Sequence, residues 1–137
     1  MKILSGQFPP NIDKIKEKLD ITDEMIKNKK IIFCYGDTVY NPTFSDIPDH
    51  QIAHEQVHVR QQQNKPDEWW ELYLNDVDFR LSQEIEAYKA QYQYVKRFIK
   101  DRNLLNKYAL TFAGYLSDEI YGNLITTLEA LNLIKQD

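Results

Sequence analysis

The motif His54-Glu55-Gln56-Val57-His58 has the residue types and the spacing for metal-assisted hydrolysis. On a helix, side chains four residues apart lie one turn from each other on the same face, so both imidazoles can bind one ion. Imidazole nitrogens bind Zn²⁺ at about 2.0–2.1 Å. A glutamate between the two ligands can act as general base toward a water at the metal. The motif therefore predicts a helical zinc site with Glu55 as the general base.

The apolar neighbours of the motif lie on a different side of the predicted helix. At about 100° per residue, Ile52 and Val59 share one side, and His54 and His58 are nearly opposite. The alternative interpretation is a pair of surface or hydrogen-bonded histidines. His50 lies one turn earlier, but it is about 12 Å from His58 along a helix axis, so one ion cannot bind all three. We expect His50 at the rim of the site or exposed.

The third ligand must be a carboxylate or Cys34, because no histidine follows the motif. Glu84 and Glu86 lie about 200° apart on a helix, so only one of them can face the metal. The apolar stripe of that helix places Glu84 on the inward side. A carboxylate directed toward a core needs a partner, and zinc provides one. We predict Glu84 as the third ligand; the alternative is Glu84 paired with Arg60 or Arg80.

The first part of the chain predicts short helices and a hairpin. Apolar residues at helical spacing predict a helix over 12–19, and Thr22 is a suitable N-cap for a second short helix. β-branched and aromatic residues predict a strand over 30–35. A Gly-Asp turn then leads to a second strand over 38–40. The sequence thus places a small sheet or hairpin before the motif helix.

The remainder of the chain is predicted to be helical. Pro48 suits the first turn of the motif helix, and Thr126 and Glu129 form a plausible capping box for the last helix. The expected helices cover 48–64, a segment that begins at Pro66, 79–100, 104–117 and 127–135. The predicted fold class is therefore α+β and mostly helical. Trp69 and Trp70 are expected to pack in the core rather than to line a pocket.

Composition and charge restrict the possible functions. The 137 residues are 42% hydrophobic and 28% charged, which is ordinary for one globular domain, so we predict a single domain over 1–137. The net charge of −4 argues against a nucleic-acid partner. No apolar run approaches the length of a membrane span or a signal peptide. We therefore expect no membrane association and a cytoplasmic location, with the lone Cys34 buried.

The motif pair His54-Glu55-x-x-His58 and Glu84-x-x-Ala87 resembles the gluzincin superfamily of zinc metallopeptidases. The resemblance covers two helices, less than half of the chain. It implies a minimal zincin-like domain, one Zn²⁺ per chain held by His54, His58 and Glu84, and a peptide or protein substrate. Such peptidases commonly bind the substrate as an added strand beside the zinc helix. The segment is also similar to small phage and prophage metallopeptidase-like proteins.

One position departs from the gluzincin pattern. Many gluzincins have an aspartate four residues after the ligand glutamate, and here that residue is Tyr88. We expect Tyr88 to be the catalytic donor to the oxyanion, with Tyr92 or Tyr115 as alternatives. The implied activity is a zinc-dependent peptidase. The alternatives are a non-catalytic, zinc-stabilised phage structural or interaction protein and a regulatory peptidase similar to phage antirepressor metallopeptidases.

Overall fold

The computed structural model describes residues 1–136 and has an α+β fold that is mostly helical, which confirms the predicted fold class. The elements follow in the order β1 (Lys2–Ser5), α1 (Ile12–Leu19), α2 (Asp23–Lys29), β2 (Phe33–Tyr35), β3 (Thr38–Asn41), α3 (Asp49–Gln62), α4 (Pro66–Asn75), α5 (Val77–Phe98), α6 (Arg102–Leu116), the 3₁₀ turn η1 (Glu119–Tyr121) and α7 (Thr127–Lys135).

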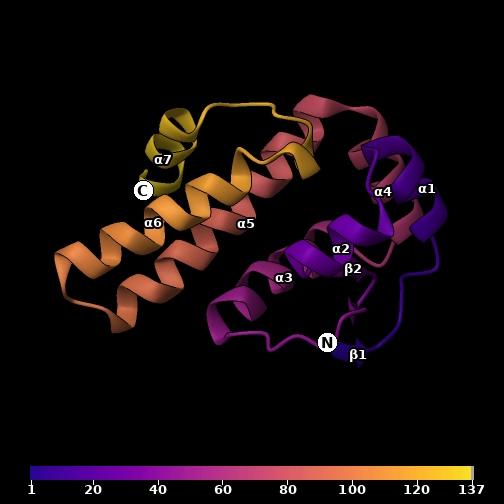
Figure 1. Ribbon diagram of the computed structural model, residues 1–137, viewed down its shortest axis with the longest axis horizontal. Coiled ribbons are helices and arrows are strands. Elements are labelled where there is room, and N and C mark those ends of the chain that lie inside the picture. Colours follow the sequence, from indigo (N-terminus) through magenta and orange to yellow (C-terminus); the bar gives the residue numbers. More distant parts are fainter. Residues whose placement is uncertain (137) are drawn as a thin grey trace.

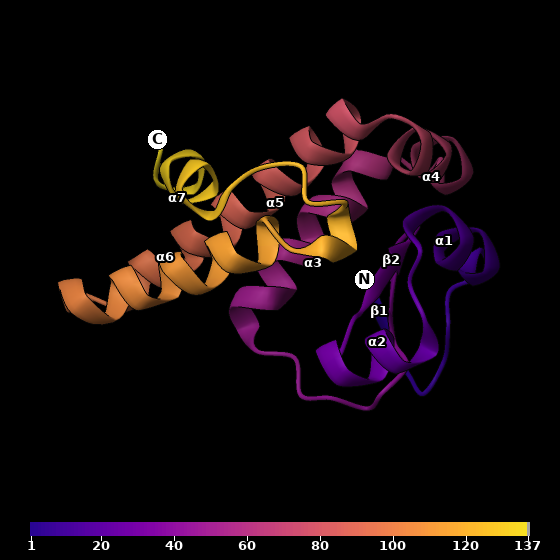
Figure 2. The ribbon, with the colours of Figure 1, turned by 45° about the horizontal axis from the view of Figure 1, so that its top comes forward.

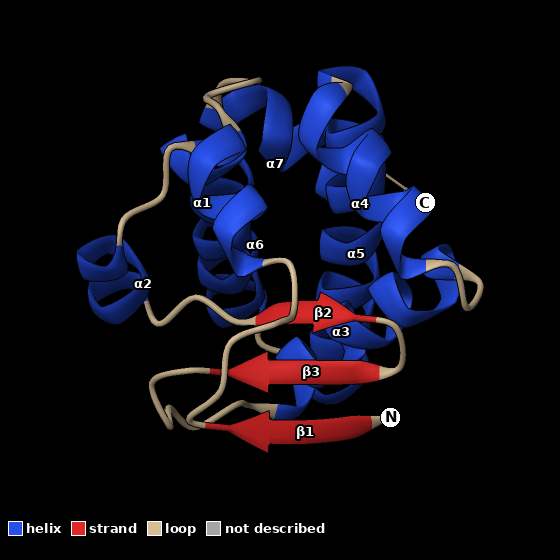
Figure 3. Cartoon of the chain, turned by 90° about the vertical axis from the view of Figure 1, so that its right-hand side faces the viewer, coloured by secondary structure: helices blue, strands red, loops and turns tan. Residues whose placement is uncertain are grey.

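The sheet has three strands in the order β1-β3-β2 (Figure 3). The predicted hairpin is present: β2 and β3 pair antiparallel, with Tyr35 opposite Thr38, and Gly36 in the turn has a positive φ of 64°. β1 was not predicted. It pairs parallel with β3, with Ile3 opposite Val39. Its short sequence shows no clear alternation, so the strand is defined by its pairing to β3 rather than by its own pattern.

The strand predicted over 30–35 is shorter than expected. Lys30 has a positive φ of 54° and forms the C-cap of α2, and the Ile31 N–H donates to the Ile26 carbonyl. Lys30 and Ile31 therefore close a helix, and only Phe33–Tyr35 pairs as a strand. Periodicity could not separate these two roles for a short apolar run.

The helices lie close to their predicted positions, and side chains explain several of their ends. Pro48 is the N-cap of α3, and Gln63 ends that helix with a φ of 48°. The Asp76 side chain accepts a hydrogen bond from the Phe79 N–H, which starts α5 directly after α4. The predicted capping box at the start of α7 is present. No helix within residues 1–136 has the length and apolar character needed to cross a membrane.

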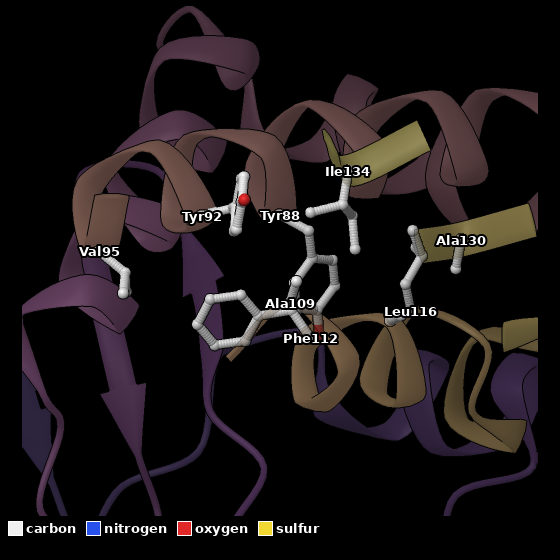
Figure 4. Close-up of a cluster of buried hydrophobic side chains, with 9 residues drawn as sticks. Tyr88, Tyr92, Val95, Ala109, Phe112, Leu116, Ala130 and Ile134 are labelled. Atoms are coloured by element: carbon white, nitrogen blue, oxygen red, sulfur yellow. The ribbon is translucent and has the colours of Figure 1, made fainter. Parts of the chain in front are cut away.

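The helices α5, α6 and α7 pack together (Figures 1 and 2), and their buried side chains form one hydrophobic cluster. Figure 4 shows this cluster, which includes Tyr88 and Tyr92 of α5, Phe112 of α6 and Ile134 of α7. A second cluster joins α1, α2, β2 and α4. It contains the buried Trp69 and Trp70, as predicted. The helix α3 packs mainly on α5.

Candidate metal centre

The helix α3 buries a polar face. His54, Glu55 and His58 are each 5% exposed, and Gln62 is 2% exposed. Burial of polar and ionisable groups is unfavourable unless each finds a partner. The buried polar face of α3 therefore needs an explanation in terms of specific partners, and α5 supplies several of them.

The structure brings together the three residues that the sequence predicts as metal ligands. Nε2 of His54 and Nε2 of His58 are 3.1 Å apart, and each lies 3.3 Å from Oε1 of Glu84. The histidines come from α3 and the glutamate from α5. Among the His, Cys, Asp and Glu side chains of residues 1–136, these three form a group that could hold a metal ion. Glu86 is exposed and Cys34 is not a member of the group.

The spacing of these three atoms fits a tetrahedral ion. Ligands at about 2.0–2.1 Å from a tetrahedral centre lie about 3.3–3.4 Å from one another. The observed separations of 3.1 and 3.3 Å are close to that value. Three protein ligands is also the number that catalytic zinc sites use.

Gln61 determines which ring nitrogen of neutral His58 carries the proton, and so which one can act as an acceptor at the centre. Its amide nitrogen donates to the Gln83 backbone carbonyl at 3.0 Å and to Oε1 of Glu86 at 3.0 Å. The amide oxygen of Gln61 therefore faces Nδ1 of His58, 2.8 Å away, and Nδ1 must be the donor. The neutral ring then presents the lone pair of Nε2 to the centre.

His54 is oriented in the same way from α5. Its Nδ1 donates to Oε1 of Gln91 at 3.0 Å, and the Gln91 amide nitrogen donates to Nδ1 of His50 at 2.9 Å. Burial lowers the pKa of His50, which favours the neutral ring that accepts this bond. His50 packs against the rings of Tyr108 and Phe112, outside the ligand group. It thus supports the orientation of His54 through Gln91.

Glu84 has one satisfied oxygen and one that faces the centre. Oε2 accepts from the Tyr73 hydroxyl at 2.6 Å, whereas Oε1 is buried without a hydrogen-bond donor among the described residues. Oε1 and the two Nε2 atoms are therefore three acceptors directed at one point. Such a cluster is electrostatically unfavourable unless a positive charge occupies that point. The group can hold a metal ion.

Neither arginine expected as an alternative partner pairs with Glu84 within residues 1–136: Arg60 is exposed, and Arg80 has another role. The buried Arg80 donates to the backbone carbonyls of Tyr73 and Leu74 at the end of α4, and to that of Tyr121 in η1. It joins α4 to η1 and makes no ion pair with Glu84 within residues 1–136.

In the metal-free protein, the ionisable groups of the centre favour a trapped proton. Burial alone would lower the pKa of His58, but the charges of Glu84 and Glu55 outweigh burial and raise the pKa to about 9. Burial alone would raise the pKa of Glu84. The charges and hydrogen bonds of His58 and His54 outweigh burial and hold this pKa well below its usual range. A metal ion that binds here must displace the proton on His58.

Glu55 lies beside the ligand group but does not join it. Its Oε1 is 3.9 Å from Nε2 of His54. Burial raises the pKa of Glu55, and the nearby His54 and His58 partly offset this effect. Glu55 also lines a pocket together with the three ligands. The structure thus places Glu55 in the wall of the same pocket as the three candidate ligands.

The structure directs the Tyr88 hydroxyl toward another tyrosine. The Tyr88 ring packs edge-on against His54, with centroids 4.4 Å apart, and its hydroxyl is 2.8 Å from that of Tyr121. Tyr121 lines the pocket, and Tyr88 is not among the lining residues. Tyr92 is buried in the hydrophobic cluster of α5–α7, and Tyr115 is mostly exposed. The role of Tyr88 as oxyanion donor stays a prediction.

The pocket beside the centre has a volume of about 70 Å³. Besides His54, Glu55, His58 and Glu84, its walls come from α1, the 21–34 region, α4 and η1. Trp69 and Trp70 contribute to these walls. We expected them to pack in the core rather than to line a pocket. The structure shows that they do both: they are buried in the core and also line this pocket.

The outer edge of β2 is already paired by side chains. The Gln62 amide accepts from the Gly36 N–H at 2.7 Å and donates to the Cys34 carbonyl at 3.2 Å, as the peptide group of a neighbouring strand would. The Trp70 indole N–H donates to the same carbonyl at 3.0 Å. A carbonyl oxygen has two lone pairs, so this one is fully used. The expected added strand cannot pair with β2 at Cys34 and Gly36.

Sequence reasoning missed the residues that orient the ligands: Gln61, Gln91 and Tyr73. Gln61 follows His58 by three residues on α3, and Gln91 follows Glu84 by seven residues on α5, so each glutamine shares a helical face with a candidate ligand, although Gln91 contacts His54. Helical spacing could have identified the two glutamines. Tyr73 belongs to a third helix, and no local pattern relates it to Glu84.

Comparisons of the chain with protein-family models, curated proteins and solved structures found no match. Membership of the gluzincin superfamily therefore stays a prediction.

Proposed function

We propose that this protein is a zinc-dependent hydrolase that cleaves peptide bonds, with His54, His58 and Glu84 as metal ligands. The set of two imidazoles and one carboxylate suits Zn²⁺ among the common divalent ions. The observation that carries the proposal is Glu55. A site that only held a structural metal would have no use for a further buried carboxylate beside the ligands, and burying it is unfavourable.

A bound Zn²⁺ would supply Lewis acidity and lower the pKa of a coordinated water. The protein's own residues supply the positioning and the proton transfer. Gln61, Gln91 and Tyr73 hold the three ligand side chains in place by the hydrogen bonds described above. Glu55 takes the proton from the attacking water and delivers it to the leaving amine, as a general base and then a general acid. Burial raises the pKa of Glu55, which makes its carboxylate a stronger proton acceptor than an exposed glutamate.

A second candidate function is supported by the burial of the ligands. His54, His58 and Glu84 are only 3–5% exposed, as in sites where a metal holds two helices together. In that case the ion would stabilise the packing of α3 on α5 without any reaction. The two candidates differ in what Glu55 does.

Replacement of Glu55 by glutamine tests the proposal. Glu55→Gln keeps the shape of the side chain but cannot accept the proton, so peptide cleavage should fall by at least about 100-fold. Zinc content, measured by elemental analysis, should stay at that of the wild type. The assay uses a mixture of fluorogenic peptides, and the metal-free protein serves as the negative control. Equal cleavage by wild type and Glu55→Gln would refute the role of Glu55, and absence of cleavage by zinc-loaded wild type would favour the structural metal.

A further inference from the structure

The pocket beside the metal centre has two chemically distinct sides. One part of the lining carries His54, Glu55, His58 and Glu84. The remainder is mostly apolar: it has the aliphatic residues Ile15, Leu19, Ile21, Ile31 and Ile120 together with aromatic rings such as Trp69 and Trp70. The aliphatic side chains come from α1, the segment between α1 and α2, the segment between α2 and β2, and η1, so four separate parts of the chain supply the same chemistry. No lysine or arginine is among the residues that line this pocket.

We propose that the metal centre accepts a compact, uncharged aliphatic group in this pocket and discriminates against an anionic one; this proposal rests on the proposed hydrolase function and names its substrate class. Each methylene that moves from water to an apolar wall tightens binding by about fourfold. The hydroxamate or peptide group of the ligand would occupy the metal, so a carboxylate at its other end would lie near Glu55 and Glu84 with no cationic side chain to pair with, and its burial is unfavourable.

The volume of the pocket limits the size of the group. One water requires roughly 10–15 Å³ of such space, so about 70 Å³ holds roughly five atoms of that size. This matches a branched side chain of about four carbons, and the rest of a longer alkyl chain would extend beyond the pocket walls. The preferred peptide residue is therefore of the leucine, isoleucine or valine type.

The side of β2 next to α3 supports a compact ligand rather than an extended one. Gln62 and Trp70 already occupy the hydrogen-bonding groups of Cys34 and Gly36. Main-chain pairing with a substrate strand therefore contributes nothing at these positions. The side chain in the pocket must then supply a larger share of the binding free energy than it does in strand-addition complexes.

Alkyl hydroxamates, whose two oxygens bind zinc, test the proposal without any need for turnover. Acetohydroxamate, butyrohydroxamate and 4-methylpentanohydroxamate extend one chain toward a leucine-like end, and octanohydroxamate exceeds the pocket. Succinic monohydroxamate replaces the terminal isopropyl group of 4-methylpentanohydroxamate by a carboxylate of similar shape. Isothermal titration calorimetry with the zinc-loaded protein gives the Kd of each compound.

We expect 4-methylpentanohydroxamate to bind at least tenfold more tightly than acetohydroxamate and than succinic monohydroxamate, with no further gain for octanohydroxamate. Leu19→Ala should reduce the advantage of the branched chain several-fold and leave acetohydroxamate unaffected. Leu105→Ala removes a half-buried leucine from the other hydrophobic cluster and should change neither value. In Leu19→Lys, the affinity for succinic monohydroxamate should rise.

A Kd that does not depend on chain length, an anionic compound that binds as tightly as its isopropyl counterpart, or no binding of any hydroxamate would each overturn the proposal. These outcomes are separable from the fate of the proposed function. A protein that shows the expected series but cleaves no peptide loses only the hydrolase assignment. A protein that cleaves peptides but shows a flat series loses only the pocket preference.

Discussion

At the scale of single residues, the centre is organised by groups that are not ligands themselves. The amide of Gln61 can face His58 in only one orientation, because its nitrogen must donate to a backbone carbonyl. That orientation makes Nδ1 of His58 a donor and leaves Nε2 as an acceptor. Gln91 accepts from Nδ1 of His54 and so leaves its Nε2 as an acceptor. Tyr73 donates to Oε2 of Glu84 and leaves Oε1 facing the centre. Once the proton on His58 is displaced, three acceptors therefore converge on one point.

Gln61 should affect metal affinity although it does not touch the metal. Gln61→Ala removes the partner that orients His58, and loss of such a partner typically weakens metal binding by about 10–100-fold. Competition with a chromophoric zinc chelator measures the affinity. The control is Gln56→Ala, since Gln56 is exposed on the same helix. Equal affinities of Gln61→Ala and the wild type would show that His58 is held by packing alone.

Metal affinity should depend on pH through His58. The proton on His58 stabilises the metal-free state below its pKa of about 9, and zinc must displace it. The apparent affinity should thus rise by about tenfold per pH unit from about pH 7 toward pH 9 and level off above that. Chelator competition across this range measures the slope. A plateau that begins near the ordinary histidine pKa of about 6.5 would contradict the trapped proton.

At the scale of elements, the centre depends on how closely α3 approaches α5. Ala87 is fully buried one turn after Glu84, on the same face of α5. We expect its small side chain to let the two helices approach closely enough for the ligand atoms to lie 3.1–3.3 Å apart. A larger side chain at this position would separate the helices or force strained rotamers.

Ala87→Leu should therefore weaken both the fold and the metal site. Overpacking of a buried position typically costs about 1–3 kcal/mol, and the expected loss in the free energy of unfolding is in that range. Urea denaturation of the metal-free protein measures the stability, and chelator competition measures the affinity for zinc. Ala90→Leu is the control, because Ala90 is half-buried on the same helix. If Ala87→Leu is no less stable than Ala90→Leu, Ala87 does not limit the approach of α3 to α5.

The elements also show what the sequence could and could not predict. Helices with apolar periodicity or clear caps, such as α5 and α7, were predicted within about two residues. β1 was missed and residues 30–32 were misassigned, because short apolar segments take their structure from long-range pairing. The ligand Glu84 could be selected because the helical stripe of α5 placed it inward. The roles of Tyr73 and Gln62 could not be predicted, because their hydrogen-bond partners lie on other elements.

At the scale of the whole molecule, the centre lies where two hydrophobic clusters meet. Tyr88, which packs on His54, belongs to the cluster of α5–α7, and Trp69, which packs on His58, belongs to that of α1, α2, β2 and α4. Binding of an ion to the native state alone should stabilise the whole fold. The central claim is therefore that His54, His58 and Glu84 bind one metal ion per chain.

Metal content of wild type and four variants tests this claim most directly. After incubation with zinc and removal of the excess, elemental analysis should find one zinc per chain in the wild type, in Glu55→Gln and in Glu86→Gln. His58→Ala and Glu84→Ala should contain almost none, while circular dichroism shows that they are still folded. Full zinc content in folded Glu84→Ala, or no zinc in the wild type, would contradict the account.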